Sequence, residues 1–291
     1  MGVIAQFSLS FSGNDTDYNV IDFYDAAEAI TGFQRSLALT THLVLNGEII
    51  TQAPSLKNAR IYILPPDRGS WKISVAIVSL ATAISQINSV PKETPLGNLI
   101  YSAYDYVISE TLGFHVDYSK TLKLQYEEYK KVHPRAPQLG ESKLDSVMEK
   151  CEPSIRQMHR PIVKTETAGV AKILYGIRKE EIPTLNATTY EYISYTSTSE
   201  EPVRIRGRIS SYNINTYKGR IFCFDEKRPI SFRLADHVKN RRSSAMITKS
   251  LTANVESKVS GEGDIYMTAF VNTSRTGTVK SYYVVSVDAV T

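Results

Sequence analysis

The chain has 291 residues, of which 42% are hydrophobic and 22% charged, with a formal net charge of +4. This composition is ordinary for a folded globular protein, and a chain of this length is expected to form two domains. The two cysteines, Cys151 and Cys223, lie far apart and have no neighbouring histidine pair. Their placement excludes a disulfide framework and a structural zinc site, and it indicates a reducing compartment.

The sequence predicts no membrane segment and no signal peptide. Residues 1–11 lack the positively charged N-terminal region of a signal peptide, and their apolar residues alternate with smaller or polar ones as in a strand. The most apolar stretch, residues 71–87, is interrupted by polar side chains and is shorter than the roughly 20 apolar residues that a spanning helix needs. We therefore expect a cytoplasmic protein without membrane contact.

The N-terminal part begins with a strand and a long helix. Apolar residues alternate over residues 3–11, which predicts a strand with one buried face. Helical spacing follows from Asp22, which can cap the helix. Asn46-Gly47 is expected to end it in a left-handed cap, although the same dipeptide also favours a hairpin turn. Residues 60–64 and 71–77 then predict a β-hairpin.

Three helices are expected next. Thr94-Pro95 supplies an N-cap and a first-turn proline for the first, and Gly113 can end it. The second begins near Leu122, and Pro134 ends it. The third starts at a capping box formed by Ser142 with Asp145. Residues 1–165 are therefore predicted to form an α+β domain, with early strands and later helices.

The C-terminal part reads as mainly β. Residues 166–201 are expected to be a linker or a connecting strand, and residues 202–291 a separate domain. Short β-type runs separated by turn residues indicate a small barrel or sandwich, OB-like or SH3-like. The predicted strands cover residues 189–196, 203–211, 220–224, 230–234, 247–255, 265–271 and 282–287.

Positive charge is concentrated in residues 203–250, which we call the basic segment. It holds 12 lysines and arginines against three acidic residues, a net charge of +9, whereas the other 243 residues sum to −5. Such segregation predicts a polyanionic partner, most commonly nucleic acid. The residues expected to contact phosphate are Arg204, Arg206, Arg208, Lys218, Arg220, Arg233, Lys239, Arg241 and Arg242.

Strand alternation places several of these basic side chains on one face of a sheet. Arg204, Arg206 and Arg208 are expected to form a row on one sheet face, about 7 Å apart. The alternative is a solvated strand face that pairs with Glu191, Glu200 or Glu201. Aromatic residues interleave with the basic ones, as in single-stranded DNA or RNA binders. The expected stacking platforms are Tyr212 and Tyr217, whereas the expected core residues are Phe222, Phe224 and Phe232.

No catalytic, cofactor or metal motif emerges from the sequence. The five histidines lack metal-ligand spacing and are expected at the surface or at helix caps. Gly261-Glu262-Gly263 precedes Asp264, which repels phosphate, so we read a turn rather than a phosphate loop. We therefore expect a non-catalytic protein without a cofactor, although a triad assembled in three dimensions stays open.

A second hypothesis is that the chain is a protein-interaction, assembly or inhibitor module. Such a module can form a homo-oligomer, and modules of this kind occur in phage–host conflict. Tyrosine is abundant, with 18 residues against nine phenylalanines. Tyrosine combines an apolar ring with a polar tip, which suits protein interfaces. The residues expected at such an interface are Trp71, Tyr101, Tyr104, Tyr126 and Tyr129.

Overall fold

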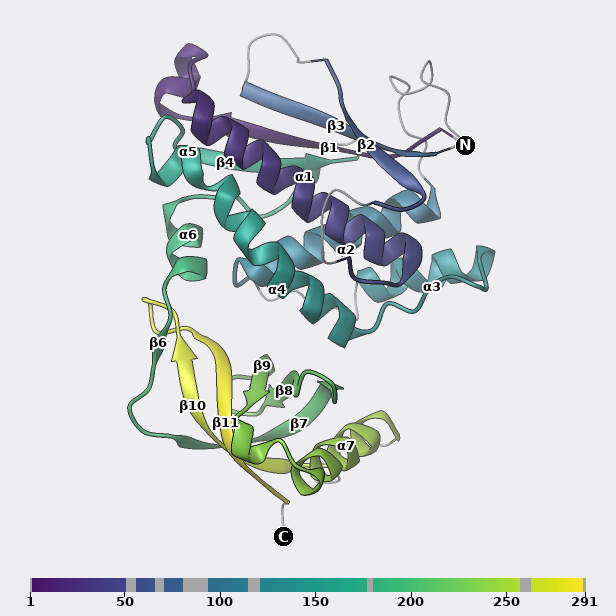
Figure 1. Cartoon of the computed structure of the whole chain (residues 1–291), viewed down its shortest axis with the longest axis vertical. Coiled ribbons are helices and arrows are strands. Elements are labelled where there is room, and N and C mark those ends of the chain that lie inside the picture. Colours follow the sequence, from purple (N-terminus) through teal and green to yellow (C-terminus); the bar gives the residue numbers. More distant parts are fainter. Residues whose placement is uncertain are drawn as a thin grey trace. The chain divides into compact units, whose positions relative to one another are not determined.

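The computed structural model describes residues 2–50, 56–65, 71–80, 94–114, 121–176, 180–256 and 263–289. The chain divides into two compact domains, Met1–Ile193 and Ser194–Thr291, and each has its own hydrophobic core (Figure 1). An α+β domain is followed by a mainly-β domain, which confirms the predicted fold class.

The boundary between the domains falls within the stretch that was predicted as a linker or connecting strand. Most of that stretch belongs to the first domain, because β4 (Val170–Tyr175) pairs with β1 (Val3–Ser12) inside its sheet. Residues 166–201, expected as a linker or a connecting strand, thus include β4 and two further described elements, at Glu180–Glu181 and Ala187–Ser194.

The first domain is a five-stranded antiparallel sheet with helices packed on it. The strand order is β2-β3-β1-β4-β5, with β2 at Ala59–Ile63, β3 at Trp71–Ser79 and β5 at Glu180–Glu181. The predicted strands over residues 3–11, 60–64 and 71–77 are confirmed, as is the pairing of the last two. The helices are η1 (Asn14–Tyr18), α1 (Phe23–Asn46), α2 (Pro95–Thr111), α3 (Leu122–Val132), α4 (Glu141–Met158), α5 (Arg160–Val163) and α6 (Ala187–Ser194).

Helix ends follow the local chemistry of the sequence in most cases. The side chain of Asp22 accepts a hydrogen bond from the Asp25 amide at 2.9 Å, and Gly47 ends α1 with a left-handed φ of 66°. Thr94 caps α2 as predicted. The capping box at Ser142 is wrong, because α4 begins one residue earlier, at Glu141, without a side-chain cap.

Two predicted strands are helices instead, and in both cases a cap explains the difference. Residues 189–196 overlap α6, where the Asn186 side chain accepts from the Thr189 amide at 3.0 Å and Thr189 Oγ1 accepts from the Asn186 amide at 2.8 Å. Residues 247–255 lie in α7 (Arg241–Glu256), where the Asn240 side chain accepts from the Ser243 amide at 3.0 Å. These caps outweigh the β propensity of the residues that follow.

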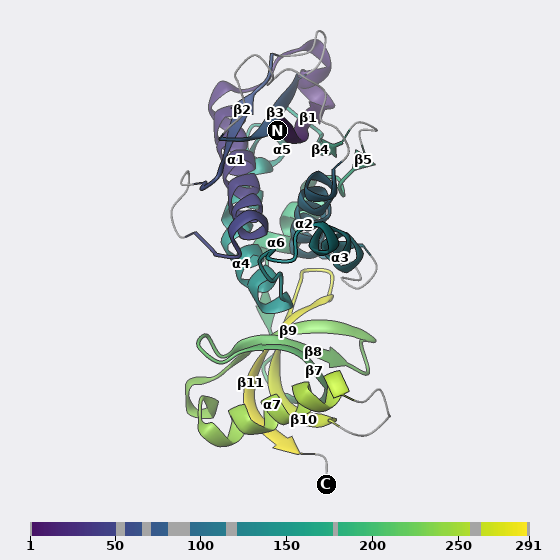
Figure 2. The ribbon, with the colours of Figure 1, turned by 90° about the vertical axis from the view of Figure 1, so that its right-hand side faces the viewer.

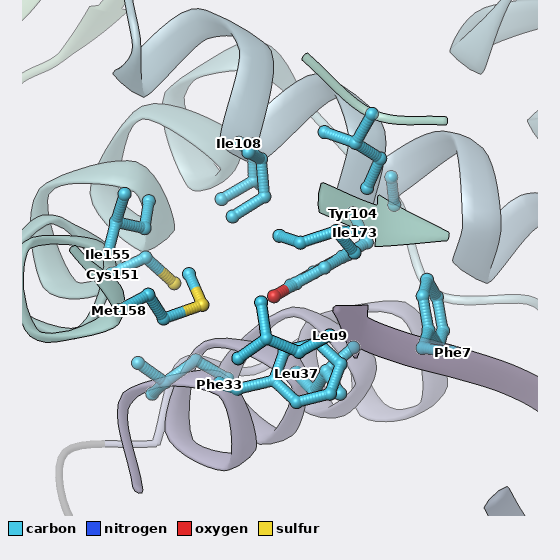
Figure 3. Packing of buried hydrophobic residues seen from close by; sticks show 14 of the residues in the cluster. Phe7, Leu9, Phe33, Leu37, Tyr104, Ile108, Cys151, Ile155, Met158 and Ile173 are labelled. Carbon is cyan, nitrogen blue, oxygen red and sulfur yellow. The ribbon is translucent and has the colours of Figure 1, made fainter. Parts of the chain in front are cut away.

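The core of the first domain forms where the helices meet one face of the sheet. Figure 3 shows Leu9 of β1 beside Phe33 and Leu37 of α1. The ring centre of Tyr104 lies 5.1 Å from that of Phe7 and 6.5 Å from that of Phe33. Side chains from α4 close the same cluster, including the buried thiol of Cys151. The alternating burial of β1 is the pattern that the sequence predicted.

Burial removes part of the predicted tyrosine interface. Tyr104 is fully buried, and its hydroxyl lies 2.8 Å from the Ser36 hydroxyl in a hydrogen bond. Tyr126 is also buried. Neither side chain is available to a partner, so the interface prediction is wrong for both. Tyr101, Tyr129 and Trp71 are half-buried, and for them the interface stays a prediction.

The histidines were expected at the surface or at helix caps. His42 is instead buried within α1, and His159 occupies the C-cap position of α4 but is also buried. His159 Nδ1 donates to the Ile155 carbonyl at 2.8 Å, so its Nε2 accepts from the Thr189 hydroxyl at 2.9 Å. Burial lowers the pKa of His159 to about 4 because the charged ring would lose its solvation. The neutral histidine thus links α4 to α6.

The second domain is a closed five-stranded barrel. The strands pair in the order β11-β9-β8-β7-β10, and β10 pairs in turn with β11. Counted from β7, the order around the barrel is β7-β8-β9-β11-β10, and β9 and β11 run parallel. This is the strand arrangement of an OB-like barrel. The elements are β6 (Ser197–Thr198), β7 (Val203–Asn213), β8 (Lys218–Cys223), β9 (Arg228–Leu234), η3 (Asp236–Val238), α7, β10 (Ile265–Thr273) and β11 (Val279–Ala289).

Helix α7 packs against β7 and β11 (Figure 2). It also stabilises an irregularity in β7, whose register shifts between Ile209 and Ser211. The Ser250 hydroxyl accepts from the Ile209 amide at 3.1 Å, and the Asn254 side-chain amide donates to the Ile209 carbonyl at 3.0 Å. In neither domain does a described helix have the length and apolar character to cross a membrane.

We predict that Gly32→Ala destabilises the first domain by about 2 kcal/mol through overpacking. A β-carbon on Gly32 would overlap the backbone carbonyl of Ser154 where α1 crosses α4. In an exposed helix the same change would stabilise by about 1 kcal/mol. Denaturant unfolding followed by fluorescence of Trp71, the single tryptophan, measures the effect. Ala27→Gly, at an exposed position of α1, is the control and should cost about 1 kcal/mol. Equal stability of Gly32→Ala and the wild type would contradict the close crossing.

We predict that the first domain loses stability as the pH falls from about 6.5 to about 4. In this range the unfolded chain binds a proton at His159 that the folded chain excludes, because the folded pKa is about 4. The loss attributable to His159 is about 3 kcal/mol, since each pKa unit corresponds to about 1.4 kcal/mol. Trp71 fluorescence during urea unfolding at several pH values measures it. His159→Gln should flatten the pH dependence, whereas His237→Gln, at an exposed ring, should preserve it. An unchanged slope in His159→Gln would refute the assignment.

Candidate nucleic-acid interface

The predicted arginine row lies on the outer face of β7. Ile205 and Ile209 point into the barrel core, whereas Arg204, Arg206 and Arg208 alternate with them and face outward. The alternation expected from the sequence is therefore present. Arg204 is exposed, Arg206 is about half-exposed and Arg208 is largely covered by its neighbours.

A carboxylate that the sequence did not associate with this row pairs with two of its members. Asp264 precedes β10, whose Tyr266 lies opposite Arg206, so Asp264 falls beside Arg208 on the same face. Arg206 donates to Asp264 Oδ2 from Nη2 at 2.7 Å and from Nε at 3.2 Å, and Arg208 Nε donates to Oδ1 at 2.6 Å. The Asp264 side chain is only 2% exposed.

This arrangement corrects the carboxylate partners that were predicted for the arginine row, whereas its contact with nucleic acid stays a prediction. The ion pairs of Arg206 and Arg208 are made with Asp264, not with the predicted partners Glu191, Glu200 or Glu201. Two guanidinium groups share one carboxylate, so the cluster keeps a net positive charge. Hydrogen bonds to charged groups also hold the planes of both guanidiniums in fixed orientations.

Aromatic rings lie under these arginines. The Arg204 guanidinium lies 4.0 Å from the ring centre of Tyr266, and those of Arg206 and Arg208 lie 5.7 and 5.8 Å from that of Phe224. These distances are typical of cation–π contacts. We call this set of side chains from β7, β8, β10 and the residues beside them the arginine–aromatic cluster: Arg204, Arg206, Arg208, Phe222, Phe224, Asp264 and Tyr266.

The prediction that Phe222 lies in the core is wrong. Phe222 is 38% exposed, and its ring centre lies 6.2 Å from that of the half-buried Phe224. The inward positions of β8 are taken by Ile221 and Cys223, so the phenylalanines that alternate with them face outward. Phe232 of β9 is buried, as predicted.

The two tyrosines predicted as stacking platforms pack against the barrel. The ring of Tyr212 is nearly parallel to that of Phe232 at 6.2 Å, and its hydroxyl lies 3.2 Å from that of Ser244. Burial raises the pKa of Tyr212 above its usual value. Tyr217 lies in the β7–β8 turn with a φ of 54° and packs against the same core. Their stacking role stays a prediction, and Phe222 is the more exposed ring.

The remaining predicted contacts do not extend the row into one continuous track. Lys218 lies opposite Arg233 in the β8–β9 ladder, and the Arg233 guanidinium is 5.2 Å from the ring centre of Tyr283. Arg220 is nearly buried. Lys239 pairs with Asp236 at 2.6 Å.

The last two predicted contacts, Arg241 and Arg242, begin α7 instead of lying in a loop, and both are exposed. The N-terminal part of α7 contacts Tyr212, near the end of β7. Eight residues of strand separate that end from Arg204, which is roughly 25 Å. The basic residues therefore form separate groups along β7.

Within the described part of the chain, no group of three or more histidine, cysteine or acidic side chains is arranged to hold a metal ion. The cluster is built from cations and aromatic rings around one carboxylate, which are groups suited to cation–π contacts and charged hydrogen bonds.

The fold defines a two-domain protein that joins an α+β domain to an OB-like barrel. Residues 7–194 match the family model described as a domain of unknown function, DUF7946, and the chain belongs to this family. Residues 201–288 match the model of a second family of unknown function, DUF7947. The matched ranges agree with the domain boundary after Ile193. No curated protein and no solved structure matches the chain significantly.

We predict that Asp264→Ala destabilises the barrel by about 2 kcal/mol, because Arg206 and Arg208 lose three charged hydrogen bonds and repel each other. Hydrogen exchange of the β7 and β10 amides in the full chain measures this domain separately from the first. Asp288→Ala, at an exposed position of β11, is the matched control and should change stability by less than about 0.5 kcal/mol. Unchanged protection in Asp264→Ala would show that the carboxylate does not hold the cluster together.

Proposed function

We propose that the C-terminal barrel binds single-stranded nucleic acid through the arginine–aromatic cluster. The observation that carries the proposal is the exposed ring of Phe222 beside guanidinium groups that make cation–π contacts with Phe224 and Tyr266. Binders of single strands combine positive charge with aromatic surfaces on which bases stack, and OB-like barrels commonly present such surfaces.

The side chains of the cluster have different roles in this proposal. Asp264 engages donors of Arg206 and Arg208, so these two arginines act mainly through their flat faces, together with Phe222 and Phe224. Guanidinium planes and aromatic rings both stack on bases. Arg204 is exposed and makes no ion pair with any described residue, so it is assigned to phosphate.

The charge of the two domains supports the same assignment. The barrel domain holds 15 basic and 9 acidic residues, a net charge of +6, whereas the first domain sums to −2. A positive domain attracts a polyanion over a distance that shortens as salt is added. Nucleic acid is therefore expected to approach the barrel and not the first domain.

Single strands are favoured over duplexes because stacking on Phe222 requires the face of a base. In a duplex both faces of each base are covered by neighbouring bases, whereas an unpaired strand can turn a base outward. The proposed ligand is therefore single-stranded DNA or RNA.

We predict different consequences for the two kinds of contact. Phe222→Ala should weaken binding of a single-stranded oligonucleotide by about 1–3 kcal/mol without changing the salt dependence, because stacking involves no counterion release. Arg204→Ala should weaken binding and reduce the slope of log K against log salt by about 0.7, the contribution of one phosphate contact on a single strand. Fluorescence anisotropy at several salt concentrations measures both effects.

The first domain offers matched controls, Phe114→Ala and Arg60→Ala, which remove an exposed ring and an exposed guanidinium. Neither should alter binding. Wild-type affinity in both Phe222→Ala and Arg204→Ala would exclude the cluster as the binding site. Absence of oligonucleotide binding by the wild type at low salt would exclude the function itself.

A further inference from the structure

The N-terminal end of α1 exposes an apolar surface made by four nearby side chains. Tyr18, Val20, Phe23 and Tyr24 are 82%, 57%, 88% and 63% exposed, respectively. We call these four side chains the α1 surface. Single exposed apolar residues are common, but four within seven consecutive positions mark an interaction site.

The backbone beneath the α1 surface is well anchored. The Thr16 amide donates to the Thr167 carbonyl at 3.0 Å, and the Val20 amide donates to the Asp15 carbonyl at 3.2 Å. Ile21, between the exposed residues, is buried in the domain core. The exposed side chains therefore stand on a fixed support, and a partner would order little backbone on binding.

The chemistry around the α1 surface indicates an arginine-bearing partner. Asp15 and Asp17 are exposed beside it. Arg160 of the same chain shows that an arginine can contact this surface through both a ring and a carboxylate. Its guanidinium lies 5.1 Å from the ring centre of Tyr24 and 2.8 Å from the carboxylate of Asp25. Acidic residues at this surface disfavour nucleic acid, anionic lipid and a second α1 surface, because like charges repel.

The chain itself carries exposed arginines that fit this description. Arg241 and Arg242 open α7, and no described residue forms an ion pair with either of them. Two cations at a helix N-terminus are unfavourable because the helix dipole is positive there. Contact with carboxylates of another molecule would offset this repulsion.

We infer that the α1 surface docks the Arg241–Arg242 end of α7 from a second copy of the chain. The contact joins two different surfaces, so each copy can bind one neighbour through its first domain and another through its barrel domain. Four side chains make a smaller contact than that of a permanent dimer, so the association is weak and depends on concentration and salt. The inference is independent of the proposed function.

Sedimentation velocity of the full chain tests the inference, after high-salt and nuclease treatment has removed bound nucleic acid. The weight-average sedimentation coefficient should rise with protein concentration at low salt, and the rise should diminish at high salt. Phe23→Ser should weaken self-association about 10-fold or more, because a large apolar side chain no longer becomes buried. Phe114→Ser, at an exposed ring elsewhere in the first domain, should have no effect.

A charge exchange identifies the paired surfaces. Asp15→Arg and Arg241→Asp should each abolish self-association, because each places like charges opposite one another. A double variant that carries both changes should associate again, because the introduced arginine of one chain then faces the introduced aspartate of the next. Far-ultraviolet circular dichroism confirms that each variant is folded.

Three outcomes would overturn the inference: a sedimentation coefficient independent of concentration, association that Phe23→Ser leaves unchanged, or a double charge variant that stays monomeric. A partner surface other than Arg241 and Arg242 would give the third outcome, because the introduced aspartate would then not face the introduced arginine.

Discussion

Pairing of β11 with both β9 and β10 closes the barrel, and the arrangement of the candidate site depends on that closure. In a closed barrel one side of every strand faces a dry core, so the other side must face outward. Ile205, Ile221 and Cys223 fill the inside. Arginine and phenylalanine side chains that alternate with them are thereby brought to one outer face from two separate strands.

The shared carboxylate of Asp264 decides how the outer face behaves electrostatically. Without it, Arg206 and Arg208 would be two neighbouring cations with free rotamers. With it, the pair holds one net charge and two fixed planes above Phe224. A residue that looks repulsive to phosphate in the sequence thus orients the groups around it. The same contact lowers the number of unpaired cations in the basic segment, so net charge alone overstates its attraction for a polyanion.

The two domains present different chemistry to their surroundings. The barrel domain is positive and shows guanidiniums in cation–π contact with aromatic rings, whereas the first domain is slightly negative and shows aromatic side chains beside carboxylates at the start of α1. Two of the tyrosines predicted at an interface, Tyr104 and Tyr126, lie inside the domain, and the Tyr104 hydroxyl forms a hydrogen bond with that of Ser36. A high tyrosine content is therefore a weak indicator of an interface, and exposure is a better one.

Features that arise from neighbouring residues could be predicted from the chain alone: the alternation of β1 and β7, the caps of α1 at Asp22 and Gly47, and a mainly-β domain after the helices. Such prediction failed for α6 and α7, where caps at Asn186 and Asn240 outweighed β propensity. Folding in three dimensions was needed to bring Asp264 to Arg208 across 56 residues and to turn Phe222 outward. Local patterns specify which side chains share a face, but barrel closure decides which face is inside and which distant residues become neighbours.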